Sequence, residues 1–320
     1  MLSIFFRLLS IFLMIGIGWI ARRRDIISAD TTRSLSRLLT YYFYPALIFT
    51  SMTRHFNADS LAANWQLPAG TFAIMLIGFT IGLLVERLLT DPHSPQGHAF
   101  LFQCTINNYS FLPMPLVLML WGEPGVAGLI FSAMGPELAI WTLGIYALSG
   151  RQLNLESFRQ LLNAPLITMV ATLCFIFLRD QIPAASAAFA SRPTVVELTD
   201  AISSSLTLLG GATIPLAMMV AGSRMAGLRS HHLFSRIQIA LALLRLVIIP
   251  AVAIGLMALL PLAGDTRRIL TLVAVMPVAI TSVVLCELYN GDSDFAASSV
   301  LITHLLCLVT VPLWLILLSI

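Results

Sequence analysis

The chain has 320 residues, of which 58% are hydrophobic and only 10% are charged, and its formal net charge is +3. Soluble domains carry charge on about a quarter of their residues, so this chain lacks the polar surface that water requires. The composition therefore predicts an all-α membrane protein whose solvent is the lipid bilayer. The small net charge is spread over short loops, which argues against nucleic acid as a partner.

Ten runs of about 20 apolar residues are long enough to cross the ~30 Å of hydrocarbon in a bilayer. They cover approximately residues 2–21, 35–53, 67–89, 97–120, 126–149, 161–178, 197–222, 235–260, 267–288 and 296–319. The first run is followed by the basic residues 22–24 and has no small-residue cleavage site. It is therefore interpreted as a membrane span and not as a signal peptide.

The cysteines give no sign of a disulfide or a metal centre. All four lie inside apolar runs and none forms a CxxC pair: Cys104, Cys174, Cys286 and Cys307. They are interpreted as small buried hydrophobic side chains, and neither a bound metal nor another cofactor is expected.

Arginine placement predicts the orientation. Loops after odd-numbered spans, with the adjoining helix ends, hold eleven arginines: Arg22, Arg23, Arg24, Arg33, Arg37, Arg87, Arg151, Arg159, Arg224, Arg229 and Arg236. Loops after even-numbered spans hold five: Arg54, Arg179, Arg192, Arg267 and Arg268. Because cytoplasmic loops are enriched in basic residues, the odd loops are predicted to be cytoplasmic and both termini to lie outside.

The ends of spans two and seven carry the same pair of residues. Pro45 is followed nine residues later by Arg54, and Pro215 is followed nine residues later by Arg224. The two pairs are offset by 170 residues, which places span two on span seven.

Spans four and nine correspond at nearly the same offset. Shifted by 169 residues, Gly122 falls on Gly291 and Asn108 falls on Pro277. The chain is therefore predicted to consist of two five-span repeats, residues 1–150 and 151–320. Because five is odd, the second repeat inserts upside down, as is common in secondary transporters.

Spans four and nine are also the two interrupted spans. The first contains Asn107, Asn108, Pro113 and Pro115, and the second contains Pro277 and the polar pair Thr281 and Ser282. A helix break frees backbone groups that lipid cannot satisfy, so it must face protein or a wet cavity. Duplicated breaks are the sequence signal for a transporter's binding site, although helix kinks within the bundle give the same pattern.

The chemistry of a broken helix favours an anionic substrate. The half-helix that resumes after the break presents free N–H groups and the positive end of its dipole. Such an end binds a carboxylate or phosphate without a basic side chain. Asn108 is expected either to donate its amide to the anion or to cap the broken backbone.

Several polar side chains fall at membrane depth, where they are costly and often functional. Glu137 in span five is a candidate acceptor for a coupling proton or cation, or a structural group, and Gln103 is a second candidate in span four. Arg245 in span eight is favoured as a helix-to-helix anchor over a substrate clamp. Glu287 and His304 are interpreted as a snorkelling acid and a core histidine.

The aromatic residues 41–44 precede Pro45. Tyrosines often mark the headgroup region of a membrane. Tyr44, next to the proline, is predicted either to belong to that aromatic belt or to line the substrate pathway.

Residues 108–116 resemble span four of the auxin efflux carrier family, because Asn108 is followed by Pro115 at the seventh position. Pro277, followed by Tyr289, Asn290 and Asp294, is similar to the second signature of that family. The resemblance extends over almost the whole chain and includes the number of spans.

Two further positions are similar to the family. Arg245 with Pro250 resembles its span-eight pattern, and Asn163 with Pro165 is similar to its Asn-Pro opening of span six, here separated by an alanine. The chain has no long hydrophilic loop between spans five and six, so it resembles a bacterial member, which implies the inner membrane.

The resemblance implies a fold like that of the plant carriers and the bile-acid:sodium symporters. Spans 1, 2, 6 and 7 would form a dimerising scaffold, and spans 3–5 and 8–10 a moving transport domain. Asn108, Pro115 and Pro277 would form the substrate crossover, and Asn163 a scaffold contact. Members carry small carboxylates such as malate, malonate or indole-3-acetate by an elevator-like movement, which implies a small organic anion as substrate and a homodimer.

Three alternatives remain open from the sequence. A sodium-coupled symporter would need clustered acids and amides near the crossover, and a channel would need no alternating access. An intramembrane enzyme is disfavoured because every aspartate lies outside the spans or at a loop edge, and there is no HExxH or GxSxG motif. Drive by ATP is excluded because the chain has no P-loop motif.

Overall fold

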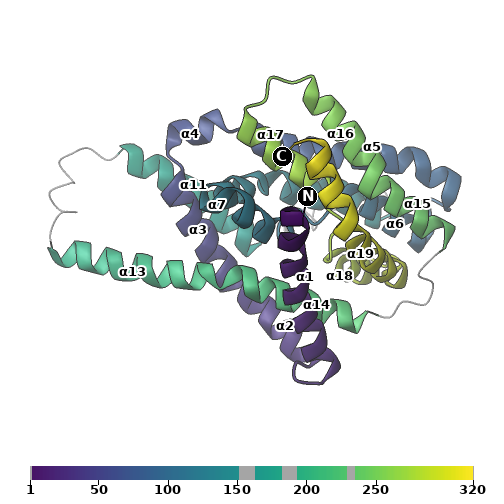
Figure 1. Ribbon diagram of the computed structural model, residues 1–320, viewed down its shortest axis with the longest axis horizontal. Helices are drawn as coiled ribbons and strands as arrows, with labels where there is room; N and C mark the ends of the chain where they lie inside the picture. Colours follow the sequence, from purple (N-terminus) through teal and green to yellow (C-terminus); the bar gives the residue numbers. More distant parts are fainter. Residues whose placement is uncertain (1, 151–162, 182–192, 229–234, 320) are drawn as a thin grey trace.

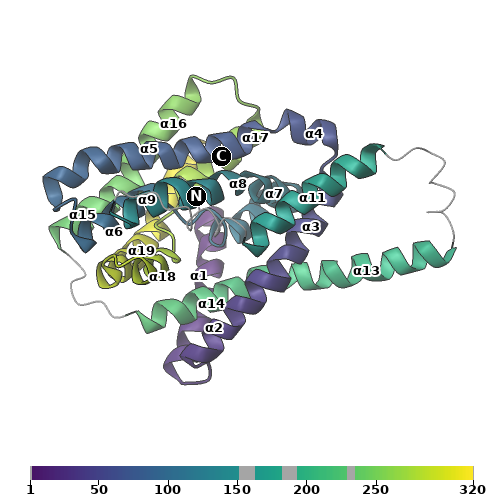
Figure 2. The same cartoon turned by 180° about the vertical axis from the view of Figure 1, so that it is seen from behind.

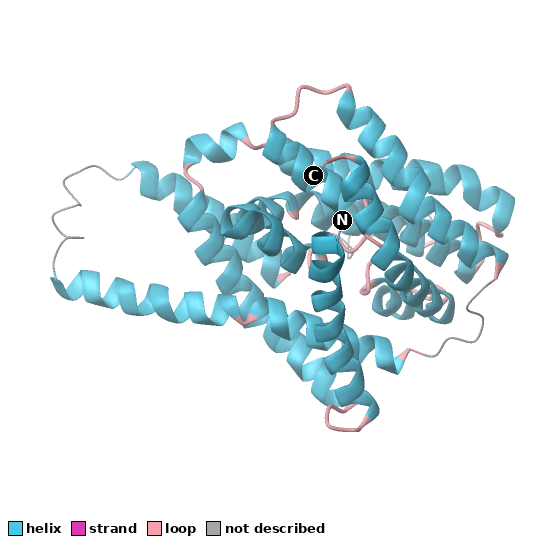
Figure 3. Ribbon diagram, in the orientation of Figure 1, coloured by secondary structure: helices cyan, strands magenta, loops and turns pink. Residues whose placement is uncertain are grey.

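The computed structural model describes residues 2–150, 163–181, 193–228 and 235–319. In these ranges the chain is helical, and its one isolated β-bridge joins Asn107 to Val278. Figure 3 shows helices linked by short loops with no sheet in the described part of the chain. The prediction of an all-α protein is thereby confirmed.

The first half of the chain forms helices that run from the N-terminus to residue 148 (Figure 1). They are α1 (Leu2–Arg23), α2 (Ala29–Leu38), η1 (Leu39–Phe43), α3 (Tyr44–His55), α4 (Ala58–Ala63), α5 (Gln66–Leu89), α6 (Pro95–Thr105), α7 (Pro113–Ser132), α8 (Met134–Ala139), η2 (Ile140–Gly144) and α9 (Ile145–Leu148). The η elements are single wide π turns inside longer helices.

The second half repeats this mixture of long and interrupted helices. It contains α11 (Ala164–Gln181), α13 (Pro193–Gly211), α14 (Thr213–Gly227), α15 (Arg236–Leu243), η4 (Leu244–Ile248), α16 (Ile249–Ala258), α17 (Gly264–Ala274), α18 (Ser282–Leu288) and α19 (Ser293–Leu317). The η4 turn is again a π turn.

Seven helices in the described part of the chain are long and apolar enough to cross a membrane: Phe5–Arg23, Ala58–Leu89, Pro113–Leu148, Ala164–Gln181, Pro193–Gly227, Arg236–Ala258 and Ser293–Leu317. They account for seven of the ten predicted spans, and Pro113–Leu148 also contains the last part of the predicted span 97–120. The other three, 35–53, 97–120 and 267–288, do not form continuous helices of that kind. Breaks at residues 106–112 and 275–281 divide the last two, and 35–53 contains an arginine and three tyrosines among its apolar residues.

The helices pack in two sets (Figure 2). In one set α1 packs against α14, α2 against α14, and α3 against α11 and α13. In the other, α5 contacts α6, α8, α16 and α17, while α18 packs on α19 and α15 on α19. The sets meet where α3 and α1 contact α7 and where α1 contacts α19.

Glycines allow the close approach of α1 and α14. A Cβ atom added at Gly18 would overlap the carbonyl of Met219, and one added at Gly222 would overlap the carbonyl of Ile15. Small residues at such contacts let membrane helices pack backbone against backbone. This pair therefore makes α1 and α14 one unit, although more than 190 residues separate Gly18 from Met219.

The π turn η4 has an identifiable cause. Pro250 in the first turn of α16 has no N–H, so the carbonyl four residues earlier, that of Leu246, has no helical donor. The indole Nε1 of Trp314 on α19 donates to that carbonyl at 2.8 Å. The proline thus leaves a carbonyl free in the widened turn, and the hydrogen bond from Trp314 to this carbonyl ties the helix to α19.

The side chain of Arg245, on η4, joins the two interrupted segments. Arg245 is fully buried, and its guanidinium donates to the carbonyl of Cys104 at 3.2 Å and to that of Ala274 at 2.8 Å. These carbonyls lie in the last turns of α6 and α17, where the breaks leave them without helical donors. The negative dipole end of each helix also favours the positive charge. The predicted helix-to-helix anchor is therefore what the contacts of Arg245 form.

We predict that Arg245→Met, which keeps the apolar stem and removes the donors, lowers the thermal unfolding midpoint of the purified protein. Two buried carbonyls would lose their partners, at about 1–3 kcal/mol each. Arg245→Lys should retain part of the stability, because the ammonium is a donor too. Arg87→Met, at an exposed position of α5, is the matched control; an equal effect of both methionine variants would contradict the anchoring role.

Candidate functional site

The two interrupted segments cross and pair through their backbones. The N–H of Asn108 donates to the carbonyl of Pro277 at 2.8 Å, and the N–H of Ala279 donates to that of Ile106 at 3.4 Å. Together with the bridge from Asn107 to Val278, these bonds form a short antiparallel ladder. Each break thus supplies partners for the other, so the freed backbone groups are satisfied without water or lipid.

Asn107 is held inside the crossover. Its side chain is fully buried, and its amide nitrogen donates to the carbonyl of Val273 in α17. Its Oδ1 atom is buried without a hydrogen-bond partner. The predicted substrate residue Asn107 therefore fastens one interrupted segment to the other half of the chain, with one acceptor unused.

Asn108 links the start of α7 to α19. Its Oδ1 accepts the N–H of Leu112, the residue before α7, at 3.3 Å, and its Nδ2 lies 3.2 Å from Nε2 of His304. The other ring nitrogen of His304 lies 2.8 Å from the carbonyl of Val300. If Nδ1 carries the proton, Nε2 accepts from Asn108 and every contact is satisfied. Asn108 thus bonds the interrupted backbone, and its predicted role as a donor to the anion stays a prediction.

His304 is the residue at the crossover that the sequence analysis did not include in the site. It is completely buried and contacts Asn108. The signal in the sequence that could have identified it is its position in the middle of α19, a largely apolar helix. A histidine there needs polar partners, and the crossover supplies them.

The prolines shape the backbone and offer no side-chain hydrogen bonds. Pro113 and Pro115 lie in the first turn of α7, where a missing N–H is tolerated. Pro277 supplies the carbonyl that accepts from Asn108. All three are buried.

The predicted residues Gln103, Thr281 and Ser282 divide between interior and cleft. The side-chain nitrogen of Gln103 donates to Oγ of Ser282 at 2.9 Å and to the carbonyl of Ala296 at 3.0 Å, which ties α6 to α18 and α19. Thr281 is exposed. The structure therefore gives Gln103 and Ser282 packing contacts and places Thr281 at a surface.

Glu137 connects the crossover to α11. Its two carboxylate oxygens accept from the hydroxyl of Tyr109 at 2.8 Å and from the amide of Asn163 at 3.0 Å. Asn163 in turn caps α11, because its Oδ1 accepts the N–H of Leu166 at 2.9 Å. Glu137 thus lies where the two packing sets meet.

Tyr44 is inside the protein and not in an exposed aromatic belt. Its side chain is buried, and its hydroxyl accepts from Ser110 at 3.1 Å, next to the crossover. Tyr41 and Tyr42 are the exposed members of the run. The pathway interpretation of Tyr44 therefore keeps a geometric basis, and the belt interpretation fits its two neighbours.

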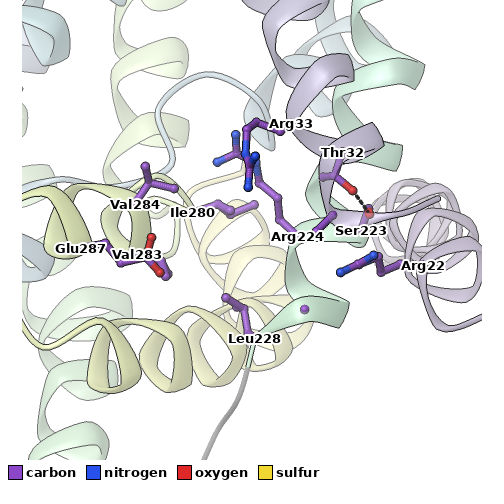
Figure 4. Close-up of a pocket in the computed structure, with 12 residues that line it drawn as sticks. Arg22, Thr32, Arg33, Ser223, Arg224, Leu228, Ile280, Val283, Val284 and Glu287 are labelled. Carbon is purple, nitrogen blue, oxygen red and sulfur yellow. Dashed lines mark hydrogen bonds between the residues drawn. The ribbon is translucent and has the colours of Figure 1, made fainter. Parts of the chain in front are cut away.

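A cleft of about 410 Å³ separates α1, α2 and α14 from α18 (Figure 4). Its polar lining includes Arg22, Thr32, Arg33, Ser223, Arg224 and Glu287. A narrower cavity of about 90 Å³ shares Arg224 and Ile280 with this cleft. Phe111 and Thr281 line the narrower cavity, which therefore adjoins the cleft and borders both interrupted segments.

The opposite end of the molecule is held together by ionic and polar contacts. Arg54 on α3 lies 3.2 Å from the carboxylate of Glu123 on α7, and Arg7 on α1 donates to the carbonyl of Met119. Arg7 and Arg22 are 15 residues apart on α1, which is about 22 Å at 1.5 Å per residue. The contacts at Arg7 and Arg54 are therefore far from the mouth of the cleft.

Comparison with known proteins places these features in a family. The family described as "Membrane transport protein" matches residues 3–160 and 164–315. The chain is 24% identical to "Uncharacterized transporter MJ1031" of Methanocaldococcus jannaschii, over 96% of each chain. It is 22% identical to "Protein PIN-LIKES 7" of Arabidopsis thaliana, over 91% of this chain and 90% of that protein. It is also 22% identical to "Uncharacterized transporter YfdV" of Escherichia coli, over 96% and 95%.

Proposed function

Since this chain belongs to the membrane transport protein family, we propose that it carries a small organic anion across the membrane as a secondary transporter. The observation that supports this most is the crossing of two interrupted segments at residues 106–112 and 275–281, reached by a cleft that is lined by arginines. Broken helices at membrane depth are where secondary transporters bind their substrates.

The substrate class follows from the charge of this route. Arg22, Arg33 and Arg224 line the cleft against a single acid, Glu287. The polar and dipolar groups at the resumed helix α7 add further positive potential. A carboxylate such as malate, malonate or an auxin-like acid matches this environment, and the same chemistry agrees with the resemblance to auxin efflux carriers.

The fold that we propose has ten spans in two inverted repeats. Breaks divide both α6 from α7 and α17 from α18, and α7 also kinks at Gly122, whose φ of 68° is left-handed. The corresponding place in the second half, near Gly291, separates α18 from α19. This matched pattern supports the repeats 1–150 and 151–320.

Movement of one packing set past the other provides alternating access. The set containing α1, α2, α3, α11, α13 and α14 would be the scaffold, and the set containing the crossover would be the transport domain. Contacts at Arg54 and Arg7 hold the two together at one end, while the cleft separates them at the other. An elevator-type displacement would separate the two sets at the end of Arg7 and Arg54 and close the cleft at the other end.

The arginine distribution supports an orientation with the cleft toward the cytoplasm and both termini outside, in a bacterial inner membrane. Labelling measures the orientation: an impermeant thiol reagent added to intact cells should not reach a cysteine placed at residue 224.

A homodimer through the scaffold is also proposed. It is supported by the apolar side chains that α11 and α13 leave exposed, among them Phe175, Leu178 and Leu198. The mass of the protein in a mild detergent tests it.

The first prediction from this function is saturable uptake of a labelled carboxylate by the purified protein in proteoliposomes. Malate, malonate and an aromatic acid would be offered under imposed proton and sodium gradients in turn. If Asn108 donates to the anion, Asn108→Ala leaves a buried carboxylate without that partner and should raise KM by roughly 5- to 150-fold. An unchanged KM in a folded Asn108→Ala protein would remove Asn108 from the site.

The same assay decides among the alternatives. Uptake that requires a sodium gradient would identify a sodium-coupled symporter. Ion conductance faster than carrier turnover would identify a channel. If the folded protein takes up no acid at all, the proposal of an organic anion is wrong, although the fold is unaffected.

A second prediction concerns coupling. Glu137 is the intramembrane acid that joins the crossover to the scaffold, so we propose it as the acceptor of a coupled proton. Gln103 is a candidate ligand if the coupling ion is a metal cation instead of a proton. Glu137→Gln cannot change its charge and should abolish the pH dependence of uptake while counterflow exchange continues. Retained pH dependence in this variant would exclude Glu137 as the carrier of the proton.

A third prediction tests the movement of the two sets. Cysteines at positions 54 and 123, in a Cys174→Ser background that removes an exposed native thiol, should react with a short bifunctional thiol reagent. The cross-link should stop turnover but leave substrate binding from the cleft side intact. Each single-cysteine variant is the control, and full turnover of the cross-linked protein would contradict relative movement at this contact.

A further inference from the structure

Arg224 stands out among the arginines of the cleft. It lies on α14, is half-buried, and lines both the outer cleft and the inner cavity. Within the described part of the chain, no hydrogen bond or ion pair engages its guanidinium, whereas Arg33 pairs with Asp30 at 3.0 Å and Arg22 donates to the carbonyl of Ile27 at 3.2 Å. Arg224 is therefore the cation in this cleft whose donors are unused.

The position of Arg224 is on the route to the crossover. Together with Ile280, it belongs to the walls of both cavities, so a solute that moves from the outer cleft to Thr281 passes its guanidinium. Figure 4 shows Arg224 extending from α14 into the cleft, with Ile280 beyond it. Val283, Val284 and Ile280 form the apolar wall opposite, and such a wall strengthens electrostatic attraction because it excludes water.

A cavity of about 140 Å³, lined by residues from both halves of the chain, resembles this inner cavity. Its α3 wall is formed by Leu47, Thr50, Ser51 and Arg54. The α14 wall of the inner cavity is formed by Ala217, Val220, Ala221 and Arg224. Each residue of the second set follows its counterpart by 170 positions, which is the offset that the sequence gives for Pro45 and Pro215. The two cavities are therefore the same construction at opposite ends of the molecule.

The two arginines differ in what they bind. Arg54 holds the carboxylate of Glu123 at 3.2 Å, and that carboxylate comes from α7 in the other packing set. Arg224 faces α18, and the acid there, Glu287, forms no ion pair with it among the described residues. Arg54 thus binds a carboxylate at the position that corresponds to Arg224 in the proposed repeat, while no described carboxylate pairs with Arg224.

We propose that Arg224 binds the carboxylate of the transported anion at the mouth of the open cleft, before the anion reaches the crossover. This inference rests on the proposed function and names the residue that recognises the substrate. The planar guanidinium has a fork of donors that matches a carboxylate in two parallel hydrogen bonds. An ammonium at the same place keeps the charge but loses that geometry.

The remaining charges of the cleft agree with this assignment. On the scaffold side are Arg22, Arg33 and Arg224, together with the hydroxyls of Thr32 and Ser223, which bond each other at 2.7 Å. On the facing side, the one charged side chain among the described residues is Glu287. A positive cleft of this kind concentrates anions and raises their association rate, an effect that falls with ionic strength.

The experiment measures carboxylate uptake with substrate supplied from the side of the cleft, in proteoliposomes of known orientation. Arg224→Gln, which is close in size and uncharged, should raise KM by roughly 10- to 100-fold with a smaller change in kcat. Arg224→Lys should recover part of the affinity. The control is Arg24→Gln, which removes the same charge at an exposed position, and it should leave KM unchanged. Substrate supplied from the opposite side should show no change in KM for Arg224→Gln.

A direct measurement protects against misfolding of the variants. In the Cys174→Ser background with Arg224 retained, a cysteine at position 284, in the wall that faces Arg224, should be labelled by a thiol reagent, and malonate at concentrations near KM should slow the labelling. Inorganic phosphate and vesicles of anionic phospholipid serve as separate arms. Protection by anionic lipid but not by malonate would assign Arg224 to a lipid headgroup and overturn the proposal.

The outcomes separate this inference from the proposed function. If the wild-type protein transports a carboxylate and Arg224→Gln has a KM within about twofold of it, which is under 0.5 kcal/mol in binding, Arg224 does not recognise the substrate and the transport function stands. If the wild-type protein transports no carboxylate, the proposed function fails and this inference fails with it.

Discussion

The rest of the structure depends on how two broken helices satisfy their backbones inside an apolar protein. A break at membrane depth leaves N–H and C=O groups that neither lipid nor an apolar side chain can bind. Here the segments 106–112 and 275–281 pair with each other, and the guanidinium of Arg245 takes one carbonyl from the end of each preceding helix. One buried cation and one short ladder therefore fix the crossing point, and they draw residues about 140 positions apart into one site.

This constraint also explains where the polar side chains lie. Asn107, Asn108, Gln103 and His304 are buried around the crossover, and each spends donors or acceptors on the interrupted backbone or on a neighbouring helix. The groups that remain for a solute are the ones that face the cleft, where the two packing sets separate. Side chains that bond the interrupted backbone therefore stabilise the crossover, because breaking such a buried hydrogen bond is costly. Side chains that face the cleft remain accessible to a substrate.

Among the site residues predicted from the sequence, those at the two helix breaks lie together. Asn108 and Pro277 are hydrogen-bonded partners, and Thr281 lines the narrower cavity beside the cleft. Glu137, Tyr109 and Asn163 are joined in a way that no spacing in the sequence indicates, because they come from three separate elements. His304 was identified as a core residue, and its contact with Asn108 is a tertiary fact. Whether these residues bind substrate or a coupling ion stays a prediction.

The sequence by itself determined that the chain is an all-α membrane protein and that two of its apolar runs are interrupted, and it favoured Arg245 as an anchor over a substrate clamp. Those conclusions follow from local rules: apolar length, proline's missing donor and the cost of a charge in lipid. Only the tertiary structure decided which carbonyls Arg245 binds and that Arg54 is paired while Arg224 is not. The physical reason is that the Pro–Arg spacing is the same at both places, whereas the partner of each arginine comes from a distant helix and depends on how the two packing sets meet at each end.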